Sequence, residues 1–149
     1  MSQHDGSTPR PTTFREHPSE AWKTAVSVLD EARPPAFPED ARIVTAWVEY
    51  PPGDPGTPPH RHFGPVFGYV LEGEMLYELE GGPPRVIRAG EPFWEPGGDL
   101  IHYQDANHRT DMPLRFLATL VCPPDAPLLE LVDDQELERR APHRVPRTD

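Results

Sequence analysis

The chain has 149 residues, of which 22 are proline and 11 are glycine, and its formal net charge is −11. Prolines at this density exclude a helical bundle, because each one removes a backbone donor and clashes with the preceding turn. The acidic surface and the lack of a basic stripe argue against a nucleic-acid partner. No apolar run approaches the roughly 20 residues of a membrane span, and the first residues do not resemble a signal peptide. We therefore expect a cytoplasmic protein with no membrane contact.

The order of segments predicts one domain made of short strands. Residues 1–18 are polar and predict a flexible arm, residues 19–141 a single domain, and residues 142–149 a C-terminal tail. The segment Trp22 to Leu29 has an ambiguous period, which allows a strand or a helix. Strands separated by proline and glycine turns are then predicted at residues 42–50, 66–71, 75–79, 85–88, 93–95, 100–106 and 114–121. Residues 133–140 contain good helix formers and no proline, so they predict one short helix. This pattern is typical of an all-β sandwich, barrel or jelly roll.

The stretch from Pro58 to Pro65 contains a His-x-His pair between prolines. Side chains two residues apart on an extended segment project from the same face, so His60 and His62 lie side by side. Adjacent imidazoles suit a divalent transition metal such as Fe, Mn, Ni, Zn or Cu. The pair alone is a weak signal, because an exposed loop could carry it too.

The residues that follow resemble the two motifs of the cupin superfamily, at residues 53–73 and 90–107. In the first motif, His60 and His62 match the paired histidines and Gly73 matches the closing glycine. Gly90, Pro96 and Gly98 match the second motif, in which His102 and Asn107 each come one residue late. The resemblance implies a small jelly-roll barrel, or double-stranded β-helix, with metal ligands that point into it.

One departure from the family pattern concerns the metal ligands. The acidic ligand of the first motif falls at Val66, whose side chain cannot bind a metal. The remaining candidates form a three-histidine site: His60, His62 and His102. Three neutral imidazoles would leave a divalent ion with its full charge and with open positions, as a Lewis acid requires. Glu49 or Glu95, on neighbouring strands, is a possible substitute for the missing carboxylate.

Further residues are candidates for a pocket around this site. Gln104 follows His102 by two residues, so strand alternation turns it toward the same interior as a candidate catalytic group. By the same alternation, Glu74, Glu78 and Glu80 face water and Tyr77 faces inward. The candidate pocket residues are Trp47, Val66, Gly68, Tyr77 and Phe93, and core packing is the alternative role for the aromatic ones. We expect His108 and His143 at the surface.

These observations predict a metal-dependent enzyme that acts on a small organic molecule with a carbonyl or enolisable oxygen. Oxygenation is the first choice, and isomerisation, cyclisation or lyase chemistry on the same Lewis acid is the alternative. A non-catalytic small-molecule-binding cupin is the other alternative, although no segment predicts the helix-turn-helix of a transcriptional sensor. We also expect a homodimer, because small cupins commonly pair and the segment Trp22 to Leu29 is free to extend a partner's sheet.

Overall fold

The computed structural model describes residues 26–146 of the chain. The chain divides into two compact units, residues 1–32 and 33–149, and the first is described only from residue 26 onward. In that short part, Val26 forms an isolated bridge and residues 27–32 have no regular structure. The predicted arm at residues 1–18 and most of the segment Trp22 to Leu29 lie outside the described residues.

The second unit consists of short strands followed by one helix. The strands are β1 (Arg42–Tyr50), β2 (His60–Arg61), β3 (Val66–Glu72), β4 (Glu74–Leu79), β5 (Arg85–Arg88), β6 (Pro92–Glu95), β7 (His102–Asn107), β8 (Leu114–Cys122) and β9 (Glu130–Leu131). The helix α1 (Asp134–Arg140) is followed by a 3-10 turn at Ala141–His143. The seven predicted strands and the predicted helix begin and end within two residues of the observed ones. Asp133 caps the N-terminus of the helix, where its side chain accepts a hydrogen bond from the Glu136 amide.

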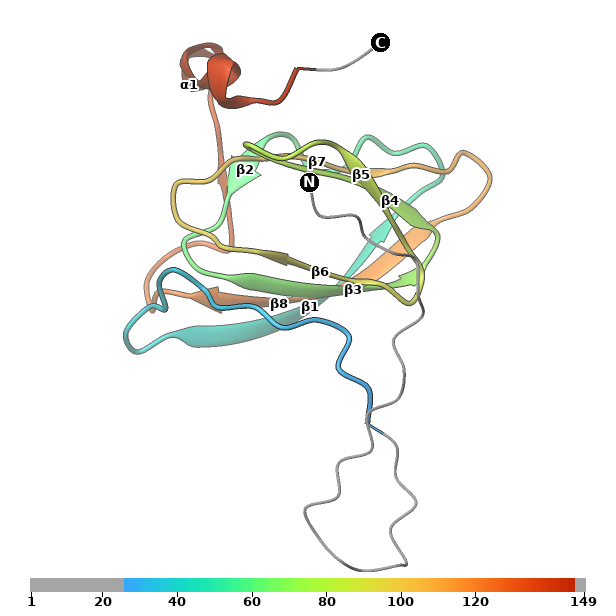
Figure 1. Ribbon diagram of the computed structural model, residues 1–149, viewed down its shortest axis with the longest axis horizontal. Helices are drawn as coiled ribbons and strands as arrows, with labels where there is room; N and C mark the ends of the chain where they lie inside the picture. The colour runs from blue at the N-terminus through green and yellow to red at the C-terminus, as the bar shows by residue number, and fades with distance from the viewer. Residues whose placement is uncertain (1–25, 147–149) are drawn as a thin grey trace, which may run out of the picture. The chain divides into compact units, whose positions relative to one another are not determined.

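Two antiparallel sheets pack face to face (Figure 1). One sheet has the order β1-β8-β3-β6 and the other the order β5-β4-β7-β2-β9. Helix α1 lies outside the second sheet, on the side away from the first (Figure 1). The predicted all-β jelly roll with a short C-terminal helix is therefore confirmed.

The core fills the space between the two sheets. Its largest fully buried members include Met75, Ile87 and Leu114. Gly73 links β3 to β4 with a φ of +82°, a conformation that favours glycine, and a Cβ there would lie 2.5 Å from the Pro113 carbonyl oxygen. Gly68 faces its cross-strand neighbour Phe93, and a Cβ at this position would lie 1.9 Å from the Phe93 ring. Only glycine at position 68 thus lets the Phe93 ring occupy its place.

The C-terminal segment covers the outer face of the second sheet. Val132 and Leu137 pack against Ile101 and Tyr103 in a second apolar cluster. Arg144 donates two hydrogen bonds to Glu78, at 2.6 and 2.9 Å, and its guanidinium lies 4.4 Å from the centre of the Tyr103 ring. Residue 144, in the segment predicted as a tail, is thus in contact with the sheet.

This covering corrects the expectation that Glu78 and Glu80 face water. Glu78 is 1% exposed and is paired with Arg144, and the side chain of Glu80 is 8% exposed and is paired with Arg140. Strand alternation placed these carboxylates on the outer face correctly, but no local pattern indicates that another segment covers this face. Buried carboxylates of this kind require a charged partner, which the two arginines supply.

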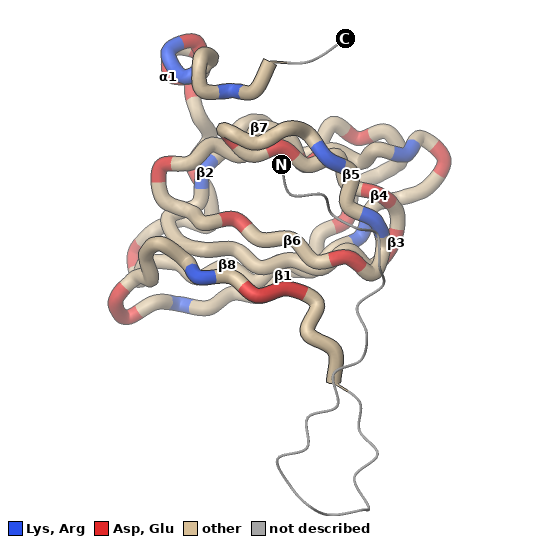
Figure 2. Tube along the Cα trace, viewed as in Figure 1, with Lys and Arg blue, Asp and Glu red and all other residues tan. Residues whose placement is uncertain are grey.

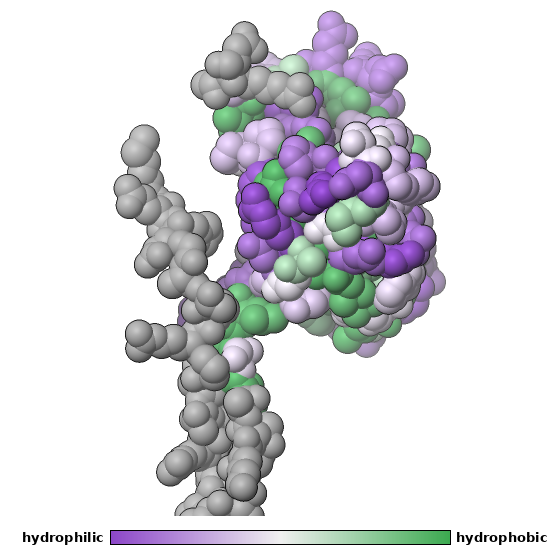
Figure 3. Space-filling model, turned by 90° about the vertical axis from the view of Figure 1, so that its right-hand side faces the viewer, coloured by the Kyte–Doolittle hydropathy of each residue, from purple (hydrophilic) through white to green (hydrophobic). Residues whose placement is uncertain are grey.

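Charged residues are scattered over both sheets of the described part (Figure 2). The face shown in Figure 3 is mostly hydrophilic, with apolar residues among the polar ones in its upper and lower parts. Among residues 26–146, no helix is long and apolar enough to span a bilayer.

Candidate metal centre

Four buried side chains meet at one point between the two sheets. They are His60, His62, Glu95 and His102, and one potential ligand atom from each lies within 4.8 Å of the others. All four residues are at most 9% exposed. His60 lies on β2, His62 directly after it, Glu95 at the end of β6 and His102 at the start of β7.

The strand register explains how residues distant in sequence come together. His60 is paired with His102 across β2 and β7, so the two imidazoles project from neighbouring positions of one sheet. Val66 is paired with Glu95 across β3 and β6 in the other sheet. Side chains of directly paired residues project to the same side with their Cβ atoms about 5 Å apart. The carboxylate missing at Val66 is thus supplied by its cross-strand partner, Glu95.

This finding corrects the three-histidine site. A carboxylate does accompany the histidines, and it is Glu95 rather than Glu49. The Glu49 side chain is 48% exposed and accepts a hydrogen bond from Arg115 on the outside of the barrel. The alternation of β1 turns Glu49 outward, as it does Trp47.

Backbone carbonyls hold two of the imidazole rings. Nδ1 of His60 lies 2.8 Å from the Pro58 carbonyl oxygen, and Nδ1 of His62 lies 2.7 Å from that of Leu128. A carbonyl oxygen only accepts, so both Nδ1 atoms must carry the proton. In the neutral rings, the lone pair is then on Nε2, the atom left to bind a metal. A metal-bound histidine is commonly oriented in this way.

The third imidazole is paired with the carboxylate. Nδ1 of His102 lies 2.9 Å from one oxygen of Glu95, and Nε2 of His62 lies 3.6 Å from the other. Burial by itself lowers the pKa of His102, but the Glu95 carboxylate outweighs it and raises that pKa. Burial likewise opposes the charge of Glu95, but the neighbouring imidazoles, His102 above all, lower the pKa of the carboxyl group. Burial and the proximity of His102 lower the pKa of His60.

The donor set fits a divalent transition metal. Nε2 of His102 is buried and has no hydrogen-bond partner among the described residues, whereas Nδ1 faces Glu95. An unsatisfied buried nitrogen is costly in a folded protein, and a metal ion would satisfy it. Three imidazoles and one carboxylate are ligands that Fe, Mn, Ni, Zn and Cu accept.

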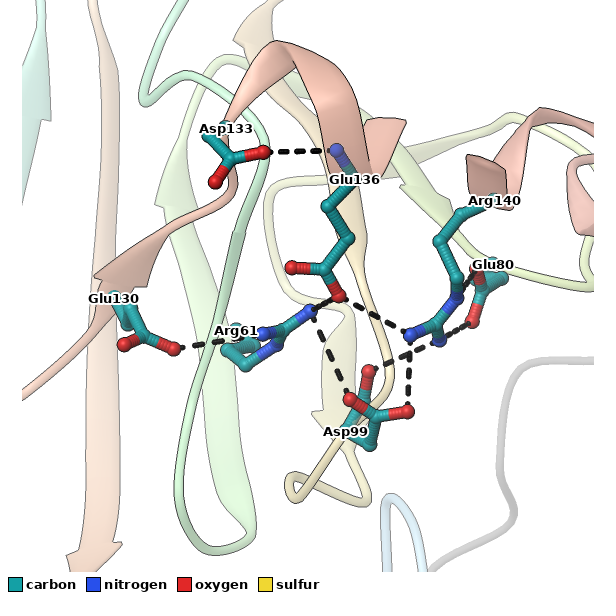
Figure 4. A network of polar contacts seen from close by, with 7 residues as sticks. All are labelled: Arg61, Glu80, Asp99, Glu130, Asp133, Glu136 and Arg140. Carbon is teal, nitrogen blue, oxygen red and sulfur yellow. Dashed lines mark hydrogen bonds and ion pairs between the residues drawn. The ribbon is translucent and has the colours of Figure 1, made fainter. Parts of the chain in front are cut away.

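A network of ion pairs holds Arg61, the residue between His60 and His62, from the outer side of the sheet. The Arg61 side chain contacts Glu136 of α1, and its guanidinium lies 3.5 Å from Glu130 (Figure 4). Arg140, also on α1, joins Glu80 and Asp99 to the same network. Helix α1 is thereby tied to the short strand that presents His60 and His62.

An apolar cavity of about 280 Å³ adjoins the four-residue cluster. Its walls come from both sheets and from the segment before β9. The apolar lining residues are Ala46, Val48, Val66, Met75, Phe93, Phe116, Ala118, Leu120, Leu128 and Leu129. Besides the cluster itself, the polar lining consists of Tyr50, Thr57 and Asp105.

The expected pocket residues have different positions. Val66 and Phe93 line the cavity. Tyr77 is 3% exposed and lies behind His102, with 4.9 Å between the ring centres, so it supports the imidazole rather than forming a wall of the cavity. Gly68 acts indirectly, through the space it leaves for Phe93. The prediction for Trp47 is wrong, because its side chain is 61% exposed on the outer face.

The prediction that Gln104 faces the site is also wrong. A β-bulge interrupts the pairing of β4 and β7, where Glu78 pairs with Gln104 but Leu79 pairs with His102. The extra residue reverses the alternation of side chains. Gln104 therefore points outward and donates a hydrogen bond to Glu78, while Asp105 takes the inward position.

Comparison with known proteins identifies the family. A family model for the cupin domain matches residues 46–120, half of the chain. The chain belongs to the cupin superfamily. No curated protein matches it in a sequence search.

Two solved cupin structures resemble this cupin. An oxalate oxidase in complex with the substrate analogue glycolate is 28% identical with a TM-score of 0.51, over 60% of this chain and 46% of that one. The DMSP lyase DddQ from Ruegeria pomeroyi is 26% identical with a TM-score of 0.52, over 63% of this chain and 44% of that one. This cupin therefore spans less than half the length of either neighbour.

Sequence reasoning missed several residues of the site. Tyr50, Thr57 and Asp105 carry no motif, and the bulge that turns Asp105 inward has no signal in the sequence. The Leu128 carbonyl that orients His62 comes from a segment 66 residues away. Glu95 lies within the second motif, and only its register with Val66 distinguishes it from a surface carboxylate.

Proposed function

We propose that this cupin is a metal-dependent enzyme in which His60, His62, Glu95 and His102 hold one divalent transition metal. The observation that carries the proposal is the convergence of four buried ligand groups beside an apolar cavity. A bound divalent ion would supply Lewis-acid or redox chemistry at an oxygen of a small organic molecule. The substrate class is a small molecule with a carbonyl or enolisable oxygen.

The protein's own groups set the conditions for such chemistry. Three neutral imidazoles and one carboxylate reduce the charge of the site from +2 to +1, which still favours an anionic or enolate oxygen. The carbonyls of Pro58 and Leu128 keep His60 and His62 in the tautomers that coordinate. The apolar walls exclude water and so strengthen electrostatic interactions inside the cavity.

Oxygenation with dioxygen is the reaction we place first, because the donor set suits iron and manganese and one structural neighbour is an oxalate oxidase. Lyase, isomerase or cyclase chemistry is the second candidate, favoured by the similarity to a DMSP lyase. A dioxygen-uptake screen with candidate substrates separates the two, since only the first consumes dioxygen.

Metal analysis tests the proposal directly. We expect the purified protein, or the protein reloaded with Fe²⁺, Mn²⁺, Ni²⁺ or Zn²⁺, to hold one ion per chain. His62→Ala should lose that ion, and His108→Ala, which changes an exposed histidine, should keep it. Failure of the wild-type chain to bind any of these ions stoichiometrically would overturn the proposal.

A further inference from the structure

Three polar side chains form a hydrogen-bonded group in the wall of the cavity. Tyr50 comes from β1, Thr57 from the loop before β2 and Asp105 from β7. The Tyr50 hydroxyl lies 2.8 Å from Asp105 Oδ2 and 2.8 Å from Thr57 Oγ1, and the Thr57 amide lies 2.7 Å from Asp105 Oδ1. We call Tyr50, Thr57 and Asp105 the acceptor trio.

A count of protons shows that the acceptor trio has no donor left. The Tyr50 hydroxyl donates its proton to Asp105, so the Thr57 hydroxyl must donate to Tyr50. The Thr57 amide proton is also directed to Asp105. The groups that the acceptor trio offers to a ligand in the cavity are therefore oxygen lone pairs. Asp105 contributes most of them, because each carboxylate oxygen can accept more than one hydrogen bond.

The cavity also lacks a positive side chain. Among the described residues, its lining contains no lysine or arginine. A ligand carboxylate near the acceptor trio would therefore face a buried carboxylate, Asp105, without a counter-ion, which is costly in an apolar surrounding. A hydroxyl or N–H group of a ligand would instead find acceptors waiting.

The acceptor trio and the metal centre are separated by the length of a small molecule. Asp105 comes three residues after His102 on β7, but the bulge between them leaves the two residues opposite Tyr77 and Leu79 of β4, only two residue steps or roughly 7 Å apart along the strand. Aromatic rings bound the space between them: the Phe116 ring centre lies 5.8 Å from that of Tyr50 and 5.8 Å from that of Phe93. A molecule with one ring, or a chain of similar length, matches this distance.

We propose that the acceptor trio selects the substrate: a neutral molecule with an apolar body, an oxygen at one end for the metal centre and a hydrogen-bond donor at the other. Carboxylates at the distal end are excluded by Asp105. The inference rests on the proposed function for the metal-binding end of the ligand, whereas the distal selection depends on the trio alone.

Three benzaldehydes that differ only in the para substituent test this selection. They are 4-(hydroxymethyl)benzaldehyde, which has a donor, 4-(methoxymethyl)benzaldehyde, which only accepts, and 4-formylbenzoate, which is anionic. Dissociation constants are measured by calorimetry with Zn²⁺-loaded protein and again with protein treated with a chelator. A hydrogen bond to a charged acceptor predicts that the alcohol binds about 10- to 100-fold more tightly than the ether. In the chelator-treated protein, where no metal can take its carboxylate, 4-formylbenzoate should bind most weakly.

Two variants identify the group responsible. Asp105→Asn places an amide donor in the trio and should remove the preference for the alcohol. Asp111→Asn makes the same change at an exposed aspartate that pairs with Arg109 outside the cavity and should keep the preference, so it serves as the matched control. Equal affinities for alcohol and ether in the wild type, no binding of any probe, or an unchanged preference in folded Asp105→Asn would overturn the inference. A preference that persists in the chelator-treated protein supports the trio even where the metal proposal fails.

Discussion

The pairing of Val66 with Glu95 predicts that the metal-binding carboxylate can be exchanged between the two strands. Both residues are buried, at 2% and 5% exposure, and they are direct neighbours across β3 and β6. Three variants test the exchange: Glu95→Val, Val66→Glu and the double variant that carries both changes. The double variant moves the carboxylate by one cross-strand spacing, about 5 Å, which the flexible glutamate side chain can span.

The size of the effect follows from the number of ligands. A four-ligand structural zinc site contributes about 10–16 kcal/mol, or about 3 kcal/mol for each ligand. Loss of one ligand in Glu95→Val should therefore weaken Zn²⁺ binding at least about 100-fold. The double variant should recover most of this affinity, to within about tenfold, since a displaced ligand costs less than an absent one. Val66→Glu alone puts two carboxylates side by side, which should destabilise the metal-free protein and favour metal binding.

Competition with a chromophoric chelator at constant pH measures the Zn²⁺ affinity of each variant, and circular dichroism confirms that it is folded. Glu49→Val is the control, because this exposed glutamate pairs with Arg115 outside the barrel and should leave the affinity unchanged. Wild-type affinity in Glu95→Val would show that the carboxylate of Glu95 is not a ligand. If Glu95→Val does lose affinity, a double variant that binds Zn²⁺ no better would show that a carboxylate at position 66 does not reach the ion, against the register described for β3 and β6.

Three further predictions concern the support, the pH dependence and the assembly of the site. Glu136→Gln removes a charged partner of Arg61 and should weaken Zn²⁺ binding about tenfold. Glu138→Gln changes an exposed residue of the same helix and should leave Zn²⁺ binding unchanged. Equal effects of the two variants in the competition assay would show that the ion-pair network does not position His60 and His62. Because Glu95 raises the pKa of His102 above its usual value of about 6.5, protons should compete with the metal first at His102. Zn²⁺ affinity should therefore begin to fall above about pH 6.5 and continue to fall below it, and the metal should be lost near pH 4. An affinity that stays constant between about pH 8 and 5 would exclude coordination by the histidines. Light scattering at micromolar concentration should give the mass of a homodimer. If the outer face that carries the exposed Trp47 is the interface, Trp47→Glu should shift the measured mass toward that of the monomer. A monomeric wild type would refute the dimer.

The sequence by itself determined the class of fold and the histidines of the site. Proline and glycine turns at short intervals leave only short strands, and seven of those strands were located from their alternation. His60 and His62 are two residues apart on an extended segment, so their common direction follows from the geometry of a strand. His102 was found from the spacing of the second motif.

The tertiary structure decided the rest, because it depends on pairing between strands that are distant in the chain. The register of β3 with β6 makes Glu95 the neighbour of Val66, and no local pattern distinguishes that carboxylate from Glu49 on β1. The bulge in β7 exchanges the orientations of Gln104 and Asp105, since one extra residue in a ladder reverses the side chains beyond it. The C-terminal segment, through Arg140 and Arg144, covers carboxylates that alternation placed on the outer face of the sheet. Local sequence sets which side of a strand a residue occupies, but only the neighbouring strands and the segments packed over them decide what that side faces.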